Sequence, residues 1–318
     1  MQKILLLIAS LFYFNFILAK NEIKSWQGIH ETPLSCLEQQ FAEPPVEFAN
    51  HVIWGWEGKM DKKTICNDLD SIKKKGFRAV IFEAGYKLPF KYLSEEWFKA
   101  IRTGVLEAKK RGMKVWIIDE GKYPSGFAGG KFSQERPDLR MQALVIGDTI
   151  QIKRREVMTN HKIAPEIISA VAVSTSGAPN RTVAINNGEI SFNAGLDDWK
   201  VLLVKSDFRT AVTRAVNNPN GGKDATNSLC DYLNPIAVQQ FIDWTHEQYK
   251  KYLGKELGTT VLGFRGDEPD YAHLPWTPSI VQTFKETKGY NPTPYLASFF
   301  TASPTIQEQR VKADYWDV

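Results

Sequence analysis

The strongest constraint on the fold is a repeat between residues 51 and 118, in which short apolar runs alternate with segments of helical periodicity. Three apolar runs are predicted to form strands: 51–56, 77–82 and 113–118. Two segments between them are predicted to form helices: 60–76 and 95–111. Gly76 and Gly112 end these helical segments directly before a strand. This order predicts βαβ units, and continuous apolar strands are typical of a parallel sheet covered on both faces.

The repeat is interrupted after Pro137 and resumes near residue 231. From 141 to 208 the sequence has only short alternating apolar stretches, some of them separated by turn residues. This pattern predicts an antiparallel β insertion. A helix over 236–253, a strand over 260–264 and a helix over 279–288 then restore the α/β order.

We therefore expect an α/β fold, a (β/α)8 TIM-type barrel with an inserted antiparallel β subdomain. A whole barrel takes about 250 residues, and the roughly 205 residues outside the leader and the insertion suffice for about six or seven units. Because the chain ends inside a helical pattern over 307–318, we expect the barrel to be incomplete here. The expected divisions are a signal peptide over 1–19, a lead-in over 20–48, the first part of the barrel over 49–140, the β subdomain over 141–208, and the truncated continuation of the barrel over 209–318.

The first twenty residues have the layout of a secretory leader. Lys3 gives a positive start, an apolar run follows to Leu18, and Ala19 offers a small residue for cleavage. A membrane span is the alternative, but fifteen or so apolar residues interrupted by Asn15 are short for a hydrocarbon core of about 30 Å. We expect a secreted or periplasmic protein with no stable membrane span after cleavage.

Charge and cysteine content exclude several classes of protein. The net charge is only +4, from 40 basic and 36 acidic residues that are interspersed, so no nucleic-acid footprint is indicated. Cys36, Cys66 and Cys230 lack metal-binding spacing, and either one disulfide with a free thiol or three buried thiols would fit. The adjacent His246 and Glu247 do not indicate a metal site, because neighbouring helical residues face different directions.

Carboxylates follow three of the predicted strands. Glu83 follows the second strand, Asp119-Glu120 the third, and Asp267-Glu268 the strand after the insertion. In a barrel the carboxyl ends of the strands form the active-site face. Cleavage of a glycosidic bond needs a proton donor and a second carboxylate that flank one bond. We predict Glu268 and Glu120 as the catalytic pair, while each acid could alternatively be a structural acceptor, for example a partner of Arg265.

The remaining acids and several aromatic residues are predicted to bind substrate. The acids are Asp119, Asp267 and Glu83, and the aromatic residues at strand ends or in loops are Trp54, Trp56, Tyr123 and Trp276. Aromatic residues make up 12% of the chain, with nine tryptophans, and such side chains suit stacking on a sugar ring. Core packing is the alternative for each of them, and Trp116, in the middle of an apolar run, is predicted to be core or barrel lining.

Several motifs in this order resemble one family of enzymes. The motifs are Ser94-Glu-Glu-Trp97, Ile118-Asp-Glu120 with Tyr123-Pro-Ser-Gly126, Asp231-Tyr-Leu-Asn-Pro235, Thr245-His-Glu-Gln-Tyr249, and Asp267-Glu-Pro269 with Pro275-Trp-Thr277. Together they resemble the glycoside hydrolase family 106 α-L-rhamnosidases over residues 50 to 318. The resemblance implies a (β/α)8 barrel, inverting hydrolysis by two glutamates, assigned here to Glu268 and Glu120, and a calcium-dependent site whose ligands cannot be placed.

Two other functions compete with an exo-acting glycoside hydrolase that removes a rhamnose-like sugar from an oligo- or polysaccharide. A carbohydrate-binding protein without catalysis would use the same acids as acceptors for sugar hydroxyls. A polysaccharide lyase would need a Lys, Tyr or His base beside basic groups, whereas the predicted strand ends here are acidic. The acidic strand ends therefore favour the hydrolase.

Overall fold

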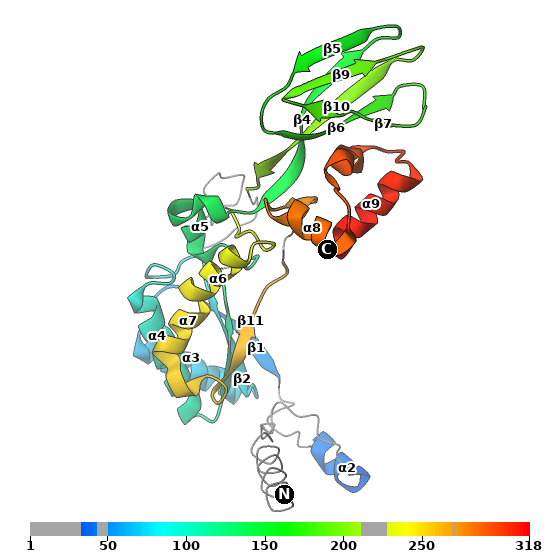
Figure 1. Ribbon diagram of the computed structural model, residues 1–318. Helices are drawn as coiled ribbons and strands as arrows, with labels where there is room; N and C mark the ends of the chain where they lie inside the picture. Colours follow the sequence, from blue (N-terminus) through cyan, green and yellow to red (C-terminus); the bar gives the residue numbers. More distant parts are fainter. Residues whose placement is uncertain (1–32, 43–49, 122, 211–227, 270, 272) are drawn as a thin grey trace, which may run out of the picture.

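The computed structural model describes residues 33–42, 50–121, 123–210, 228–269, 271 and 273–318 (Figure 1). The predicted leader over 1–19 and most of the lead-in lie outside these residues. Within the lead-in, the helix α2 (Leu34–Ala42) has no buried residue. In the part of the chain that the structure describes, no helix is both long and apolar enough to cross a membrane.

A parallel sheet of four strands is the framework of the first half of the molecule. The strands are β1 (His51–Trp56), β2 (Ala79–Ala84), β3 (Lys114–Ile118) and β11 (Val261–Arg265), paired in the order β1-β2-β3-β11. All three pairings are parallel. The prediction that these four segments are parallel neighbours in one sheet is confirmed. The start of β11 lies 143 positions after the end of β3, and the insertion and several helices lie between them along the chain.

Four helices connect these strands: α3 (Lys62–Lys74), α4 (Glu95–Lys110), α6 (Pro235–Trp244) and α7 (His246–Leu253). Helices α3, α4 and α7 cover one face of the sheet, whereas α6 packs on the segment after β3. Asp61 and Ser94 cap α3 and α4 by accepting hydrogen bonds from the backbone N–H groups of Thr64 and Trp97. Such caps satisfy donors that the first helical turn leaves unpaired.

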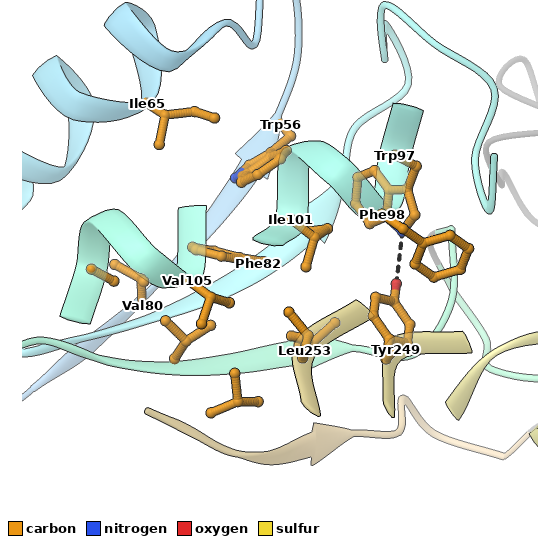
Figure 2. Close-up of a cluster of buried hydrophobic side chains, with 14 of the residues drawn as sticks. Trp56, Ile65, Val80, Phe82, Trp97, Phe98, Ile101, Val105, Tyr249 and Leu253 are labelled. Carbon is orange, nitrogen blue, oxygen red and sulfur yellow. Dashed lines mark hydrogen bonds between the residues drawn. The ribbon is translucent and has the colours of Figure 1, made fainter. Parts of the chain in front are cut away.

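The core of this half lies between the sheet and its helices (Figure 2). Alternation along a strand directs Val80, Phe82 and Ala84 of β2 toward the helices, where all three are fully buried. Trp97 and Tyr249 join α4 to α7, since the indole Nε1 of Trp97 donates to the hydroxyl of Tyr249 at 2.9 Å. Residues of the opposite parity, such as Glu83, therefore point to the other face of the sheet.

The segment predicted as a β insertion forms two antiparallel sheets. The first contains β4 (Gln142–Ile152), β6 (Ile167–Ser174), β7 (Arg181–Thr182), β10 (Trp199–Phe208) and β12 (Pro275–Trp276), in the order β12-β4-β10-β6-β7. The second contains β5 (Val157–Lys162), β8 (Ile185–Asn186) and β9 (Glu189–Asn193). A core that includes Ile152, Ile190, Phe192 and Trp199 joins the two sheets.

Residues after β11 differ from the expectation, because their helices pack on the β subdomain. These helices are α8 (Ile280–Lys288), the 3-10 helix η5 (Thr293–Phe300) and α9 (Ile306–Asp317). Phe284, Leu296 and Tyr315 share a buried cluster with Leu144 and Val204 of the larger sheet. The described residues thus contribute four parallel strands instead of six or seven. Helical periodicity shows that a helix has an apolar face, but it does not show which sheet that face covers.

Two local expectations are corrected. The helix expected over 236–253 breaks at the buried Thr245 (φ −116°, ψ −83°), whose hydroxyl donates to the carbonyl of Phe241 at 2.6 Å. The three cysteines form no disulfide, and Cys36 is exposed, so neither cysteine arrangement considered from the sequence is present. Short segments complete the fold: α5 (Lys131–Glu135) and the 3-10 helices η2 (Ala128–Gly130), η3 (Pro137–Leu139) and η4 (Gly254–Glu256).

Candidate functional site

The carboxyl ends of β2, β3 and β11 lie at one edge of the parallel sheet, and each carries acidic residues (Figure 1). The register pairs Ile118 with Arg265, and the backbone N–H of Asp119 donates to the carbonyl of Arg265 at 3.3 Å. Gly266 follows directly, and a methyl group at its Cα would lie 3.8 Å from Oδ2 of Asp119. The acids after β3 and β11 are therefore neighbours, as the parallel sheet predicts.

Glu268 is exposed at this edge. Its Oε2 accepts a hydrogen bond from the hydroxyl of Tyr123 at 3.2 Å, so the loop after β3 reaches the segment after β11. Its backbone N–H donates to Oδ1 of Asp267 at 3.3 Å. A carboxyl that is open to solvent and oriented by one hydroxyl can reach a bound substrate.

Asp119 lies largely buried behind Glu268 and is bonded to its own loop. Ser125 donates from Oγ to Oδ1 of Asp119 at 2.6 Å, and the same Oγ accepts from the backbone N–H of Asp267 at 2.8 Å. The other oxygen of Asp119 lies 3.5 Å from Nε2 of His246. Asp119 has the same parity along β3 as the buried Val115, so it points toward the helices rather than toward the open face.

Asp267 is half-buried and takes part in the same set of contacts. Besides the bond from its N–H to Ser125, its Oδ1 lies 3.9 Å from Nη2 of Arg265. The pairing with Arg265 that the sequence allowed is therefore present for Asp267, at a distance that makes it a weak surface contact.

Glu120 lies in a different environment from the one predicted for a catalytic acid. Its side chain is fully buried, and its carboxyl accepts hydrogen bonds from the backbone N–H groups of Gly121 (2.6 Å), Ala128 (2.6 Å) and Gly129 (3.1 Å). Burial raises the pKa of Glu120 to about 7, and the three N–H donors oppose that rise. Glu120 holds together the loop that carries Tyr123 and Ser125, and in this position it has no access to a substrate.

The tryptophans that were predicted to stack on sugar pack against other side chains instead. Trp56 is fully buried among the helices, and Trp54, which is half-buried, packs on Trp56 and Phe82 with ring centroids 5.4 and 5.5 Å apart. Trp276 is 6% exposed and belongs to the core of the β subdomain. The stacking roles of Trp56 and Trp276 are therefore wrong, since alternation and packing enclose both rings.

Glu83 points to the face of the sheet that the described helices leave open. It is half-buried, and a methyl group on Gly55, its partner in the register, would lie 3.6 Å from its Oε2. Trp116 has the matching parity on β3 and packs beside Gly263, where a methyl group would come within 2.9 Å of the indole ring. Trp116 is thus a lining residue of that face, in agreement with one of its two predicted roles.

A cavity of about 340 Å³ lies on the helix side of the segment 266–269. Its walls include Val238 and Phe241 of α6 with Tyr232 and Tyr271, whose rings are 5.2 Å apart, while Ser125 and Asp267 contribute polar atoms. The sequence interpretation missed Ser125, Tyr232 and His246. All three lie within the resembling motifs, and the motif order was the signal that could have singled them out.

The side chains at the sheet edge do not form the calcium site that the resemblance implies. Across the described residues, no three or more His, Cys, Asp or Glu side chains gather in an arrangement that could hold a metal ion. The acids at the sheet edge are instead bonded to Ser125, Tyr123, His246 and backbone N–H groups. These side chains do not fit a metal site, and no chemical step is assigned to one.

Comparisons with known proteins bear on the family and the fold. Residues 158–310 match the model of glycoside hydrolase family 106, described as alpha-L-rhamnosidase. A solved rhamnosidase from Novosphingobium sp. PP1Y superposes with a TM-score of 0.58 at 13% identity, over 90% of this chain and 44% of its own. A protein of Formosa agariphila named "Putative beta-glucuronidase" is 23% identical over 326 residues, which cover 86% of this chain and 27% of that protein.

The fold and these matches define a glycoside hydrolase-like protein. Within that class, the chain resembles family 106, as the sequence motifs predicted, and the matched region contains β11 with Asp267 and Glu268. The chain spans about a quarter of the curated relative and less than half of the solved rhamnosidase.

Proposed function

We propose that this protein is a glycoside hydrolase that removes a terminal, rhamnose-like sugar from a glycan, with Glu268 as the proton donor. The observation that supports this most directly is the position of Glu268. It is an exposed acid at the carboxyl edge of a parallel sheet, and Tyr123 from the neighbouring loop orients it. A proton donor of this kind typically contributes about 10²–10⁴ in rate.

Hydrolysis also needs a second carboxylate, and the structure favours Glu83 over Glu120 for it. Glu120 is enclosed by its own loop, whereas Glu83 lies half-buried on the open face at the end of β2. In a glycosidase this second group either activates water or attacks the sugar directly, depending on its separation from the acid. Glu83→Gln is therefore expected to reduce turnover with every leaving group, unlike a change of the proton donor.

The sugar is proposed from the family match. The two relatives carry different names, one a rhamnosidase and one a beta-glucuronidase, and these sugars differ in charge. A glucuronide would bring a carboxylate to an edge that already holds Asp267, Glu268 and Glu83, with Arg265 as the cation at the end of β11. Mutual repulsion of these carboxylates favours an uncharged sugar such as rhamnose.

The test measures hydrolysis of aryl α-L-rhamnosides and aryl β-D-glucuronides side by side, with natural rhamnose-containing oligosaccharides as a third substrate. We expect turnover of the rhamnosides, and loss of turnover of the natural glycans in Glu268→Gln. Turnover of the glucuronides alone would show that the sugar is a glucuronide and not rhamnose, while the protein would still be a glycoside hydrolase. Binding of glycans with no turnover of any substrate would favour the carbohydrate-binding alternative instead.

Two further proposals concern the whole protein. We propose that the four parallel strands are part of a (β/α)8 barrel, which the strand order, the helical covering and the likeness to the solved rhamnosidase support. We also propose export through the leader over 1–19. Mass spectrometry of the protein from its host should then find a mature chain that begins after Ala19.

A further inference from the structure

His246, which was not predicted as a site residue, contacts Asp119 at the sheet edge. His246 is the first residue of α7, and its Nε2 lies 3.5 Å from Oδ2 of Asp119, at ion-pair distance. Its ring stands edge-on to Phe264 of β11, with centroids 4.6 Å apart, and to Phe241 of α6, with centroids 5.7 Å apart. The two rings leave the imidazole little freedom to turn away from Asp119.

The contacts of Thr245 determine which nitrogen of His246 carries a proton. The hydroxyl of Thr245 lies 2.6 Å from the carbonyl oxygen of Phe241 and 2.9 Å from Nδ1 of His246. A carbonyl has no proton to give, so the Thr245 hydroxyl must donate its single proton to Phe241. Thr245 can then only accept from His246, and Nδ1 must be protonated.

This assignment leaves Nε2 facing a carboxylate. An Nε2 without a proton would direct its lone pair at Oδ2 of Asp119, which is repulsive, whereas one proton between the two atoms makes the contact attractive. We propose that His246 and Asp119 hold one proton between them, and that His246 is thereby a positioning residue for the segment that carries Glu268. This inference rests on the proposed function only in giving Glu268 its catalytic role.

The path from His246 to that segment is continuous. Asp119 is bonded through Oδ1 to Oγ of Ser125 at 2.6 Å, and that Oγ accepts the backbone N–H of Asp267 at 2.8 Å. Ser125 donates its only proton to Asp119, so it can serve Asp267 only as an acceptor. A change in the Asp119 carboxyl is thus transmitted to the backbone next to Glu268 by two hydrogen bonds.

The other ionisable groups around the pair are few. Glu120, Tyr92 and Tyr249 are buried close to Asp119. Arg265 ends β11, and Asp267 follows it. Glu247 and Lys250 form an exposed ion pair on α7 itself.

The first experiment determines the protonation of the ring directly. Nitrogen-15 NMR of histidine-labelled protein, assigned with His246→Asn, should show His246 protonated at Nδ1 throughout the pH range. Asp119→Asn should leave the neutral Nδ1–H form, because an amide can donate to an unprotonated Nε2. A ring protonated only at Nε2 would overturn the proposal.

The second experiment measures hydrogen exchange of the Asp267 amide in the same chain. Ser125→Ala and His246→Asn should speed this exchange about tenfold, the consequence of losing one hydrogen bond. His246→Gln should preserve slow exchange, because its amide N–H₂ reaches about the position of Nε2, and His161→Asn, on an exposed strand of the β subdomain, is the matched control. Unchanged Asp267 exchange in both Ser125→Ala and His246→Asn would overturn the positioning role.

The third experiment separates this inference from the proposed function. In an active glycosidase, His246→Asn should lower kcat by up to about 10²-fold with little change in KM, as expected for a misplaced catalytic group, and His246→Gln should restore most of it. Wild-type kinetics in His246→Asn would overturn the inference. An inactive wild-type chain with the expected amide exchange would refute the proposed function alone.

Discussion

The hydroxyl of Tyr123 donates to Oε2 of Glu268 across 3.2 Å, and this contact joins the loop after β3 to the end of β11. The two residues are 145 positions apart in the sequence, with the whole β subdomain between them. The site is therefore assembled by the pairing of β3 with β11, and its acid is oriented by a loop from a neighbouring strand.

The role of Glu268 is tested by its conversion to Gln, which keeps the shape of the side chain and removes the proton. Hydrolysis of natural glycans should fall by about 10²–10⁴ in kcat/KM. Activated aryl glycosides need little protonation and should lose much less. If natural glycans are hydrolysed within about threefold of wild type, a loss well short of the acid-catalysis range, Glu268 is not the acid.

The role of Tyr123 is tested by its conversion to Phe, which removes only the donor. The hydroxyl fixes the orientation of the Glu268 carboxyl, so its loss should lower kcat by about 10- to 100-fold, as expected for a misplaced catalytic group. Tyr252→Phe is the control, because that ring stacks on Phe98 in the helical layer, with centroids 5.0 Å apart. An unchanged kcat in Tyr123→Phe would show that Glu268 does not depend on this hydroxyl.

Glu120 is predicted to make stability depend on pH. Its folded-state pKa of about 7 is above the ordinary 4.5, so between these values the folded chain binds more protons than the unfolded chain. Its contribution to stability is therefore present below about pH 4.5 and is lost as the pH rises to about 7, by roughly 3 kcal/mol at 1.36 kcal/mol per pH unit.

Urea denaturation from pH 4.5 to pH 8 measures this effect. In Glu120→Gln the corresponding decline in the free energy of unfolding should disappear, while Glu247→Gln, on the exposed surface of α7, should behave as wild type. Glu120→Gln should also be less stable at low pH, because its amide places a donor against backbone N–H groups that need an acceptor. The same decline in wild type and Glu120→Gln would contradict the prediction.

Local patterns predicted the elements of the fold well. Each parallel strand was located within about two residues, because a continuous apolar run bounded by glycine is specific to a buried strand. The antiparallel character of residues 141–208 followed from period-two alternation in the same way. The acids at the sheet edge could be grouped because parallel strands have their carboxyl ends on one side.

What the sequence could not show depends on contacts between distant segments. Nothing local indicates that backbone N–H groups of Gly121, Ala128 and Gly129 bind the carboxyl of Glu120, or that α8 and α9 cover the β subdomain instead of the parallel sheet. The break at Thr245 was missed because Thr is compatible with a helix, and the break places His246 beside Asp119. These errors concern which surface a residue meets, and periodicity alone does not determine that.

The placement of the tryptophans on β1 gives the last prediction. Trp54 and Trp56 share one parity, and both point into the helical layer, while Trp116 points to the open face. Trp56→Ala should lower the free energy of unfolding by about 3–5 kcal/mol, as is usual for a buried Trp. Trp54→Ala should cost less, because a half-buried ring removes less apolar surface from water.

Neither Trp54→Ala nor Trp56→Ala should change the affinity of the folded protein for sugar, whereas Trp116→Ala should weaken it. Denaturation curves give the free energy of unfolding of the three variants, and a glycan-binding measurement on the same variants gives their affinity for sugar. A Trp54→Ala variant of wild-type stability that binds sugar poorly would show that Trp54 stacks on the substrate after all.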